Sequence, residues 1–313
     1  MTVRALRTTL VGCHPLMREL DRAIGSLSRN SSTVLILGES GTGKELVARA
    51  IHDRSSRSAE PFVAINCGAF ARGLLPDQLF GHLRGAFTGA GEDKEGVFQA
   101  AGEGTLFLDE IAEIDPDLQG QLLRAIQERE VVPLGSNRAV PWKARLIAAT
   151  NRDLEDQVER KLFRQDLYYR INVVQVRIPP LRDRKEDIPH LAERFLADLA
   201  PAEGRQKRMS PEALEALLGY SYPGNVRELK NAIERAYALG LSPEAIVPAD
   251  LPAEFQKSRE ESQEEGFKPL AQMEREHILR ALRLAGGRKT LAAQFLQIHR
   301  NRLDRMMKRH RIG

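Results

Sequence analysis

The chain has 313 residues, of which 42% are hydrophobic, 29% charged and 5% aromatic, with a formal net charge of +4. This composition is ordinary for a globular protein of two or three domains, and the scarcity of aromatic rings argues against stacking platforms for single-stranded nucleic acid. No apolar run approaches the roughly 18 residues of a membrane-spanning helix, and the amino-terminal segment lacks the apolar core of a signal peptide. Two cysteines, Cys13 and Cys67, cannot form a disulfide framework. We therefore expect a reduced, cytoplasmic protein with no membrane partner.

The first predicted elements are strands of a buried parallel sheet. Four short apolar runs carry this pattern, at residues 34–37, 105–108, 145–149 and 173–178. Helical patterns lie between the runs, as in sheets that are covered by helices on both faces. Ligands of such open sheets bind at the carboxyl ends of the strands. The polar residues that follow the runs are therefore the candidate site.

After the fourth apolar run, from Pro179 and Pro180 onward, the sequence pattern becomes helical. Helices are predicted from Asp187, from Ser210 and over residues 226–239. Proline is tolerated in the first turn of the first of these helices, and Ser210 is a favourable N-cap for the second. Residues 253–268 are polar and nearly free of aliphatic side chains, which predicts a linker. The apolar periodicity resumes at Leu270.

Residues 38–45, with the sequence GESGTGKE, follow the first predicted strand and precede a helical pattern. This is the context of a phosphate-binding loop, in which glycines let backbone N–H groups converge on phosphate oxygens. Lys44 would bridge the β and γ phosphates. The strict motif has Ser or Thr next, whereas Glu45 stands here. A glycine-rich strand-to-helix turn without a ligand is the alternative.

Asp109 and Glu110 follow the second predicted strand, and Asn151 follows the third. Asp109 can hold the Mg²⁺ of a nucleotide, and Glu110 can orient or deprotonate a water molecule. Alone, the two acids could stand in the first turn of a helix. Because Lys44 belongs to the same predicted sheet, ATP hydrolysis explains them better, and Asn151 could then contact the γ-phosphate or the water. The histidines show no metal-ligand spacing, so no metal beyond Mg²⁺ is expected.

Six motifs occur in one order: GESGTGKE (38–45), FGHLRGAFTGA (80–90), TLFLDE (105–110), ATNRD (149–153), FRQDLYYR (163–170) and GNVRELKN (224–231). Together they closely resemble the central domain of bacterial enhancer-binding proteins, the AAA+ activators of sigma-54 RNA polymerase. The resemblance covers residues 10 to about 250. It resumes from about 270 to 312, where the chain resembles the Fis-type helix-turn-helix of the same family. In this family Glu45 after the lysine is itself typical.

The resemblance implies an α/β fold with an AAA+ P-loop parallel sheet, helices on both faces, a helical lid and a C-terminal all-α helix-turn-helix domain. The implied boundaries are 10–180 for the ATPase subdomain, 181–252 for the lid, 253–269 for a linker and 270–313 for the DNA-binding domain. The implied function is that of a hexameric, Mg²⁺-dependent ATPase that binds enhancer DNA and remodels the closed complex of sigma-54 RNA polymerase into the open complex. A dimer at rest is also compatible. The ATPase begins near residue 10, so we expect either a regulator protein in trans or a sequence taken from a longer chain.

The resemblance also implies roles for individual residues. Asp109 would be the metal ligand, Glu110 the residue that activates water, and Asn66 the switch that pairs with Glu110. Asn151 and Arg227 would be the first and second sensors, and Arg164 and Arg170 would be arginine fingers that reach the neighbouring subunit. In isolation, these last two arginines could equally form surface salt bridges. The residues assigned to nucleotide binding are Gly38, Glu39, Ser40, Gly41, Thr42, Gly43, Lys44, Glu45, Ala101, Gly102, Glu103, Gly104, Thr105, Leu106, Phe107, Leu108, Asp109 and Glu110.

Residues 85–90 form a poor helix and a poor strand, because they are two glycines, two alanines, one phenylalanine and one threonine. Taken alone, the segment predicts a tight hairpin with Phe87 in the core. The resemblance implies instead an exposed tip that contacts sigma-54, chiefly through Phe87 and Thr88, with His82 supporting the base of the loop. The full contact set is Gly85, Ala86, Phe87, Thr88, Gly89 and Ala90.

The carboxyl-terminal end is basic. Residues 286–313 contain eight Lys or Arg and one Asp, so this end carries +7. Such charge is typical of a solvated face and also of a nucleic-acid contact. Helices over 290–296 and 301–310 would form the helix-turn-helix, with Gln297 where the family usually has glycine, and the helix before them is a candidate dimer contact. The residues expected to face double-stranded DNA are Arg300, Asn301, Arg302 and Arg305.

Two other functions remain open at this stage. One is a different AAA+ enzyme, such as a helicase or a chelatase-like remodeller. The other is a DNA-binding regulator that binds ATP only to oligomerise and represses the ordinary polymerase. The intact GAFTGA segment and the Asp109–Glu110 pair argue against the second.

Overall fold

The computed structural model describes residues 12–70, 73–203, 207–240, 242–256, 270–310 and 312. Contacts divide the chain into two units, Met1–Phe255 and Gln256–Gly313, and each unit is described by itself. In the described ranges, no helix is long and apolar enough to cross a membrane.

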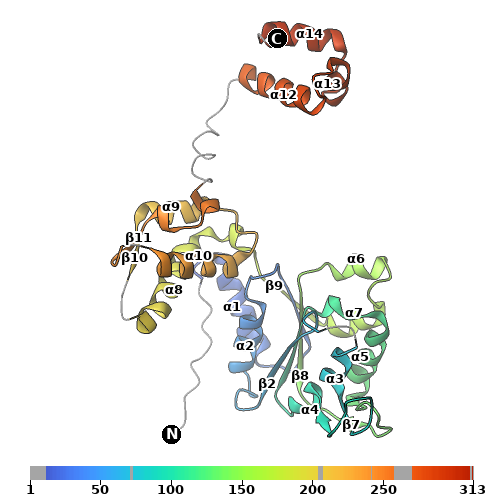
Figure 1. The fold of residues 1–313 in the computed structure, drawn as a ribbon. Helices are drawn as coiled ribbons and strands as arrows, with labels where there is room; N and C mark the ends of the chain where they lie inside the picture. The colour runs from blue at the N-terminus through green and yellow to red at the C-terminus, as the bar shows by residue number, and fades with distance from the viewer. Residues whose placement is uncertain are drawn as a thin grey trace. The chain divides into compact units, whose positions relative to one another are not determined.

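A parallel sheet of five strands forms the centre of the first unit, in the order β2-β5-β8-β1-β9 (Figure 1). Its central strand β8 is buried at every residue, which explains the unbroken apolar pattern there. The carboxyl ends of β1 and β8 are level, since Leu37 pairs with Thr150. The strands are β1 (Val34–Leu37), β2 (Phe62–Asn66), β5 (Thr105–Asp109), β8 (Arg145–Thr150) and β9 (Val174–Arg177).

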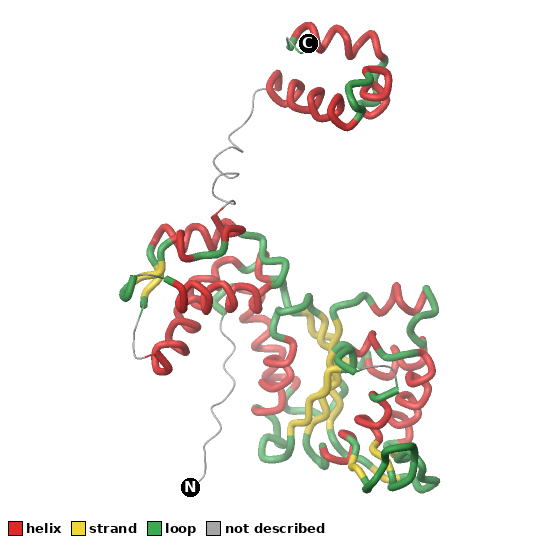
Figure 2. The backbone as a smooth tube through the Cα atoms, viewed as in Figure 1, coloured by secondary structure: helices red, strands yellow, loops and turns green. Residues whose placement is uncertain are grey.

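Helices cover both faces of this sheet (Figures 1 and 2). On one face, α1 (Pro15–Leu27) and α2 (Lys44–Asp53) share a core with β1 and β9. On the other face, a larger core holds α3 (Leu75–Phe80), α4 (Val97–Ala100), η1 (Ile111–Glu113), α5 (Pro116–Glu128), α6 (Leu154–Glu159) and α7 (Gln165–Ile171). The predicted α/β fold is therefore confirmed, including the four strands that were predicted from apolar runs.

Two short antiparallel pairs of strands adjoin the larger of the two apolar cores. They are β3 (Gly81–His82) with β4 (Lys94–Glu95), and β6 (Glu130–Val131) with β7 (Val140–Pro141). The two pairs brace each other, because Leu83 N donates to Leu134 O at 3.0 Å and Leu134 N donates to Gly81 O at 2.9 Å.

The helical lid follows β9 in the chain. It consists of η2 (Leu181–Asp183), η3 (Lys185–Asp187), α8 (Ile188–Glu203), β10 (Arg208–Met209), α9 (Pro211–Gly219), α10 (Asn225–Leu239), β11 (Ala245–Ile246) and η4 (Pro248–Asp250). Ser210 caps α9 as predicted, since its hydroxyl accepts from Ala213 N at 3.2 Å. Helices α8, α9 and α10 pack around one apolar core.

The predicted start of the linker is wrong. Residues 253–256 are helical, and Phe255 is only 2% exposed within the lid core. Its ring centroid lies 4.3 Å from that of Tyr220 and 5.8 Å from that of Tyr222. One aromatic side chain thus extends the lid into a stretch whose average composition is that of a linker. The remainder of the predicted linker, residues 257–269, lies outside the described residues.

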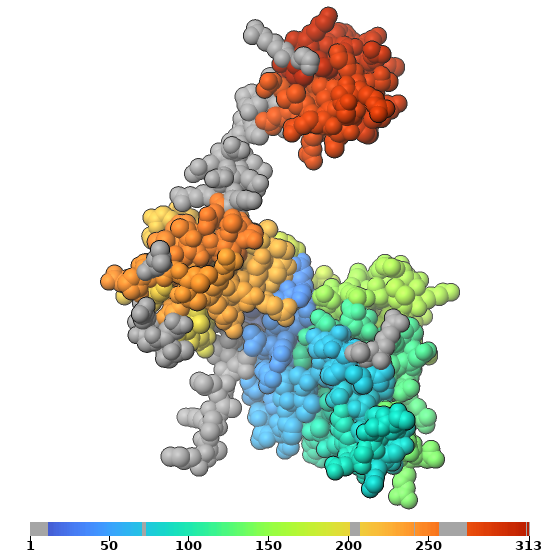
Figure 3. Space-filling model, in the orientation of Figure 1, coloured from blue at the N-terminus to red at the C-terminus, as the bar shows by residue number. Residues whose placement is uncertain are grey.

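The second unit contains α12 (Leu270–Leu284), α13 (Lys289–Phe295) and α14 (Arg300–Arg309) (Figure 1). In the space-filling view its described residues form the red body (Figure 3). A small core that includes Ile278, Ala292 and Leu303 holds them together. The turn between α13 and α14 passes through Gln297, whose φ is 52°. That left-handed conformation explains why the resembling family usually has glycine at this position.

Candidate functional site

The P-loop connects β1 to α2 and is wrapped closely around its own lysine. Gly41 and Gly43 have φ values of 78° and 100°, which glycine adopts without strain. No side chain caps the start of α2, so its first N–H groups face the loop. Lys44 is 7% exposed, and its Nζ donates to Gly38 O at 3.0 Å and to Glu39 O at 3.3 Å. Burial lowers the pKa of Lys44, while the charges of Asp109 and Glu110 oppose this shift.

The acid pair lies at the same edge of the sheet, at the end of β5. Burial raises the pKa of Asp109, and the charge of Lys44 opposes the shift. Glu110 N donates to Asp109 Oδ1 at 2.9 Å, and Glu110 has a left-handed φ of 52°. Strain of this kind in a non-glycine residue is typical of functional sites. The structure therefore brings Lys44, Asp109 and Glu110 to one edge.

Asn66 ends β2 directly beside Asp109 in the strand register. Its Oδ1 accepts from Gly68 N at 2.8 Å. A Cβ atom at Gly68 would lie 2.6 Å from Glu110 Oε2 and 3.4 Å from Asn66 Oδ1, so the two side chains flank this glycine. Asn66 and Glu110 are thus close neighbours, and their direct pairing stays a prediction.

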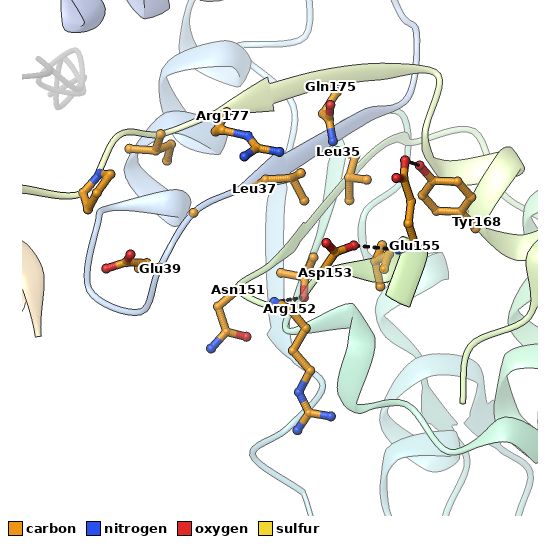
Figure 4. Close-up of a pocket in the computed structure, with 15 residues that line it drawn as sticks. Leu35, Leu37, Glu39, Asn151, Arg152, Asp153, Glu155, Tyr168, Gln175 and Arg177 are labelled. Atoms are coloured by element: carbon orange, nitrogen blue, oxygen red, sulfur yellow. Dashed lines mark hydrogen bonds between the residues drawn. The ribbon is translucent and has the colours of Figure 1, made fainter. Parts of the chain in front are cut away.

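A polar cleft of about 340 Å³ borders the other side of the P-loop (Figure 4). Glu39 comes from the P-loop, Asn151 and Arg152 follow β8, and Arg177 ends β9. Asn151 is exposed, whereas Arg152 forms an ion pair with Glu113. The cleft therefore leaves Asn151 accessible beside the P-loop.

The lid contacts the P-loop directly. Arg227, in the first turn of α10, donates through its backbone N to Gly41 O at 3.2 Å and through Nη1 to Ser40 Oγ at 3.1 Å. A Cβ atom at Gly41 would lie 2.3 Å from Gly224 O, so only glycine fits there. The predicted second sensor thus lies against the loop.

The prediction that residues 101–104 contact the nucleotide is wrong. Gly104 accepts from Arg145 N at 2.9 Å, and the next residue, Thr105, donates to Pro61 O at 2.9 Å. These are contacts at the amino ends of the strands, and a strand of this length separates its ends by roughly 15 Å. The other side chains of β5 are also removed from the site: Leu106, Phe107 and Leu108 are buried in the two apolar cores, and the buried Thr105 Oγ1 lies 3.0 Å from His52 Nδ1. Only Asp109 and Glu110 of this segment reach the P-loop edge.

Arg164 and Arg170 lie at the two ends of α7. Arg164 forms an ion pair with Asp166, with Nη2 2.8 Å from Oδ2, and both side chains are about half exposed. Arg164 therefore forms, in the single chain, the surface salt bridge that was the alternative to an arginine finger. Arg170 is exposed in the last turn of the helix.

The GAFTGA segment forms a compact turn beyond the β3–β4 pair, closed by Gly85 N donating to Ala90 O at 2.9 Å. Phe87 is 46% exposed, so it does not lie in the core. The edge of its ring packs against His82, with centroids 5.0 Å apart. His82 is held by Asp77, which also binds Lys94. The loop therefore presents one aromatic side chain on a braced base.

The predicted DNA-contacting residues are all exposed on α14, whose buried side carries Leu303 and Met307. The exposed set is Arg300, Asn301, Arg302 and Arg305.

The residues at the P-loop edge fit a nucleoside triphosphate with Mg²⁺. The bare start of α2 and the buried Lys44 suit phosphate oxygens. Within the described part of the chain, no group of three or more His, Cys, Asp or Glu side chains could hold a metal ion. Magnesium in nucleotide sites is commonly bound by one or two carboxylates together with phosphates and water, a role that Asp109 fits.

Comparison with known proteins agrees with this geometry. Residues 10–177 match the sigma-54 interaction domain, 182–267 the AAA+ ATPase lid domain and 269–310 the Fis family of bacterial regulatory proteins. This chain belongs to the family of sigma-54-dependent enhancer-binding regulators. The three matches follow one another along the chain, from AAA+ sheet through lid to helix-turn-helix.

Individual relatives cover most of the chain. The transcriptional regulatory protein ZraR of Escherichia coli K12 is 49% identical over 303 residues, which are 96% of this chain and 68% of the relative. The response regulator protein PilR of Pseudomonas aeruginosa is 47% identical over 296 residues, 92% of this chain and 66% of the relative. The crystal structure of NtrX from Brucella abortus in complex with ATP matches with a TM-score of 0.72 at 32% identity, covering 97% of this chain and 70% of that chain. The ADP complex of the same protein matches with a TM-score of 0.74.

Proposed function

We propose that this regulator hydrolyses ATP with Mg²⁺ as a hexamer and uses the energy to open promoter complexes of sigma-54 RNA polymerase. Its second unit would bind enhancer DNA. The observation that carries the proposal is that Lys44, Asp109 and Glu110 meet at one sheet edge in the same unit that exposes Phe87. The match to NtrX bound to ATP supports nucleotide binding by this edge.

Each residue at the edge has a role in this proposal. The loop 38–45 and Lys44 hold the triphosphate, and Asp109 holds Mg²⁺, which neutralises charge on the phosphate oxygens. Glu110 accepts a proton from the attacking water, and Asn151 orients that water or the γ-phosphate. Asn66, which flanks Gly68 together with Glu110, reports on the phosphate by changing its contact with Glu110.

The arginines of α7 act in trans in this proposal. The Arg164 side chain is exposed and forms its ion pair with Asp166 in the same helix turn, and Arg170 is exposed at the other end of α7. An arginine aimed at the charge that develops on the γ-phosphate can contribute about 10³–10⁵ in rate. If the neighbouring subunit supplies it, hydrolysis requires assembly, which is the reason for proposing a hexamer.

The loop tip transmits the energy. Phe87 is about half exposed, and a half-exposed aromatic ring on a turn is suited to a protein partner. The β3–β4 pair begins at the end of α3, which packs in the same core as β5 and η1. A rearrangement around Glu110 therefore has a continuous packed route to the loop, which is a structural basis for nucleotide-dependent contact with sigma-54.

The test is transcription from a sigma-54 promoter in vitro, measured beside ATP turnover. Phe87→Ala is expected to retain ATP turnover within about twofold, since the ring is remote from the P-loop, and to lose open complexes. Leu239→Ala removes another exposed apolar side chain, 67% exposed on α10, and serves as the matched control with both activities retained. Full activation by Phe87→Ala would overturn the sigma-54 contact. ATP turnover by the wild-type chain without open complexes would favour another AAA+ remodeller, and no turnover would favour a regulator that binds ATP only to oligomerise.

A further inference from the structure

Three side chains from segments that are distant in the sequence meet at the P-loop. Glu39 belongs to the loop itself, Arg182 to η2 directly after the sheet, and Asn225 begins α10. Arg182 binds Glu39 with both ends of its guanidinium, since Nη1 donates to Oε2 at 2.8 Å and Nη2 to Oε1 at 2.6 Å. The parallel, bidentate geometry is the most directional form of this ion pair.

Asn225 ties the same carboxylate to two further segments. Its Nδ2 donates to Glu39 Oε2 and to the backbone oxygen of Ser40, both at 3.1 Å. Its Oδ1 accepts from Leu181 N at 2.8 Å. Asn225 is fully buried and has a φ of 52°, a left-handed conformation that asparagine tolerates better than most residues. One side chain therefore joins the P-loop, the segment after the sheet and the lid helix.

In this arrangement both oxygens of the Glu39 carboxylate accept hydrogen bonds from the protein itself. A free carboxylate in a loop that binds a triphosphate would repel the phosphates. The hydrogen bonds from Arg182 and then Asn225 lower the pKa of Glu39 to about 2, so it stays ionised and paired in neutral solution. The Glu39 side chain therefore joins the loop to the lid, while its backbone stays part of the predicted phosphate-binding loop.

The three residues stand next to the lid residue that reaches the loop. Arg227 follows Asn225 by two positions in the same helical turn, and it bonds Gly41 O and Ser40 Oγ. The loop and lid backbones are already in contact at Gly41 and Gly224, which leaves the helix little freedom to tilt. Fixing Asn225 therefore fixes where the Arg227 guanidinium can reach.

We propose that Glu39, Arg182 and Asn225 are positioning residues that hold the first turn of α10 on the P-loop and so deliver Arg227 to the bound nucleotide. The inference rests on the proposed ATPase function. None of the three touches the reacting phosphate. Because Glu39 is part of the loop, a change of loop conformation with the nucleotide moves the lid helix as well.

The first test compares Glu39→Gln, Arg182→Gln and the double variant. Each single change is expected to raise the KM for ATP and the Kd of a fluorescent ATP analogue by about two- to fivefold, a modest effect because the ion pair is partly exposed to solvent. The double variant should be no worse than either single variant, because both changes break one contact. Arg194→Gln is the control, since it removes an exposed ion pair with Asp198 elsewhere on the lid and should leave both constants unchanged.

A second measurement separates positioning from stability alone. Arg227→Ala should weaken ATP binding strongly in the wild-type background, and adding Glu39→Gln to Arg227→Ala should weaken it no further, because Glu39 acts only through Arg227. Amide hydrogen exchange over residues 222–230 should be faster in Glu39→Gln and in Arg182→Gln, and intermediate in Arg182→Lys, which keeps the charge but loses the bidentate geometry. Independent effects of Glu39→Gln and Arg227→Ala, or unchanged exchange in this turn, would overturn the inference.

Unlike the KM for ATP, the analogue affinities and the exchange rates do not depend on catalytic turnover. If the wild-type chain binds the ATP analogue but never hydrolyses ATP, the proposed function fails, while the analogue affinities and the exchange rates still decide the inference. If the Glu39→Gln protein is unfolded, Arg182→Lys carries the same comparison with a smaller change. Normal analogue affinity and normal exchange in Arg182→Lys and Arg182→Gln together would then count against the proposed positioning role.

Discussion

Replacing Gly41 with alanine tests the contact between the P-loop and the lid. Gly41 has a φ of 78°, and a Cβ atom there would lie 2.3 Å from Gly224 O and 3.0 Å from Arg227 Cβ. Alanine must therefore adopt an unfavourable backbone conformation and displace the lid at the same time. We expect both lower stability of the first unit and weaker binding of ATP.

The magnitude follows from two contributions. A left-handed conformation costs an L-residue about 1–2 kcal/mol. Relieving the overlap requires the Gly224 carbonyl to retreat by about 1 Å, which also breaks the 3.2 Å hydrogen bond from Arg227 N to Gly41 O, at a net cost of about 1 kcal/mol. The sum is about 2–3 kcal/mol, or a decrease in Tm of roughly 4–12 °C for a unit of this size.

The assay is urea or thermal unfolding, combined with titration of a fluorescent ATP analogue. Gly25→Ala is the matched control, because Gly25 lies inside α1 and a Cβ atom there meets nothing within 4 Å. This control should raise stability by about 0.5–1 kcal/mol, since alanine favours helix over glycine. If Gly41→Ala unfolds at the wild-type midpoint and binds the analogue with wild-type affinity, the close contact between loop and lid is absent and the reasoning fails.

Three other predictions address the trans arrangement, the buried thiol and the DNA surface. Lys44→Ala and Arg170→Ala should each abolish ATP turnover, and a mixture of the two should regain it, because some interfaces then join an intact Lys44 to an intact Arg170; no recovery would contradict supply in trans. Burial raises the pKa of Cys67 to about 12, so its thiol stays protonated at pH 8 and should react with a disulfide reagent only after unfolding in urea; rapid labelling of the native protein would contradict its buried place. Arg302→Ala should weaken DNA binding at all sites and reduce the slope of log K against log salt by about 1, if the side chain contacts a phosphate; an unchanged slope would exclude that contact.

Much of the nucleotide edge was predictable because its signals are local. The strand, the glycine-rich turn and the helix after Lys44 are contiguous in the chain, and so are the strand and the acids at Asp109 and Glu110. Strand β2 shows the limit of that analysis. Its apolar run at 62–65 resembles the runs of the four predicted strands, but it is not included among them. In the structure β2 is an edge strand, and most of its residues are only partly buried.

Other features depended on which residues the fold brings into contact. Composition predicted a linker from residue 253, and a single ring, Phe255, moved the lid boundary because two tyrosines of the lid lie within reach of it. The segment 101–104 lies only a few residues before Asp109 in the sequence. The extended strand β5 between them places the segment at the opposite edge of the sheet. Closeness to Asp109 in the sequence therefore assigned too many residues to the nucleotide site.

The sequence by itself determined four of the five strands, the phosphate loop and the family, because each is encoded in short contiguous motifs whose order is specific. Only the tertiary structure decided what Glu39 does. Its partners, Arg182 and Asn225, are 143 and 186 positions away in the chain. Nothing in the local pattern around an acidic residue in a glycine-rich loop predicts which distant donors will neutralise it, because that choice is made by the packing of the lid against the sheet.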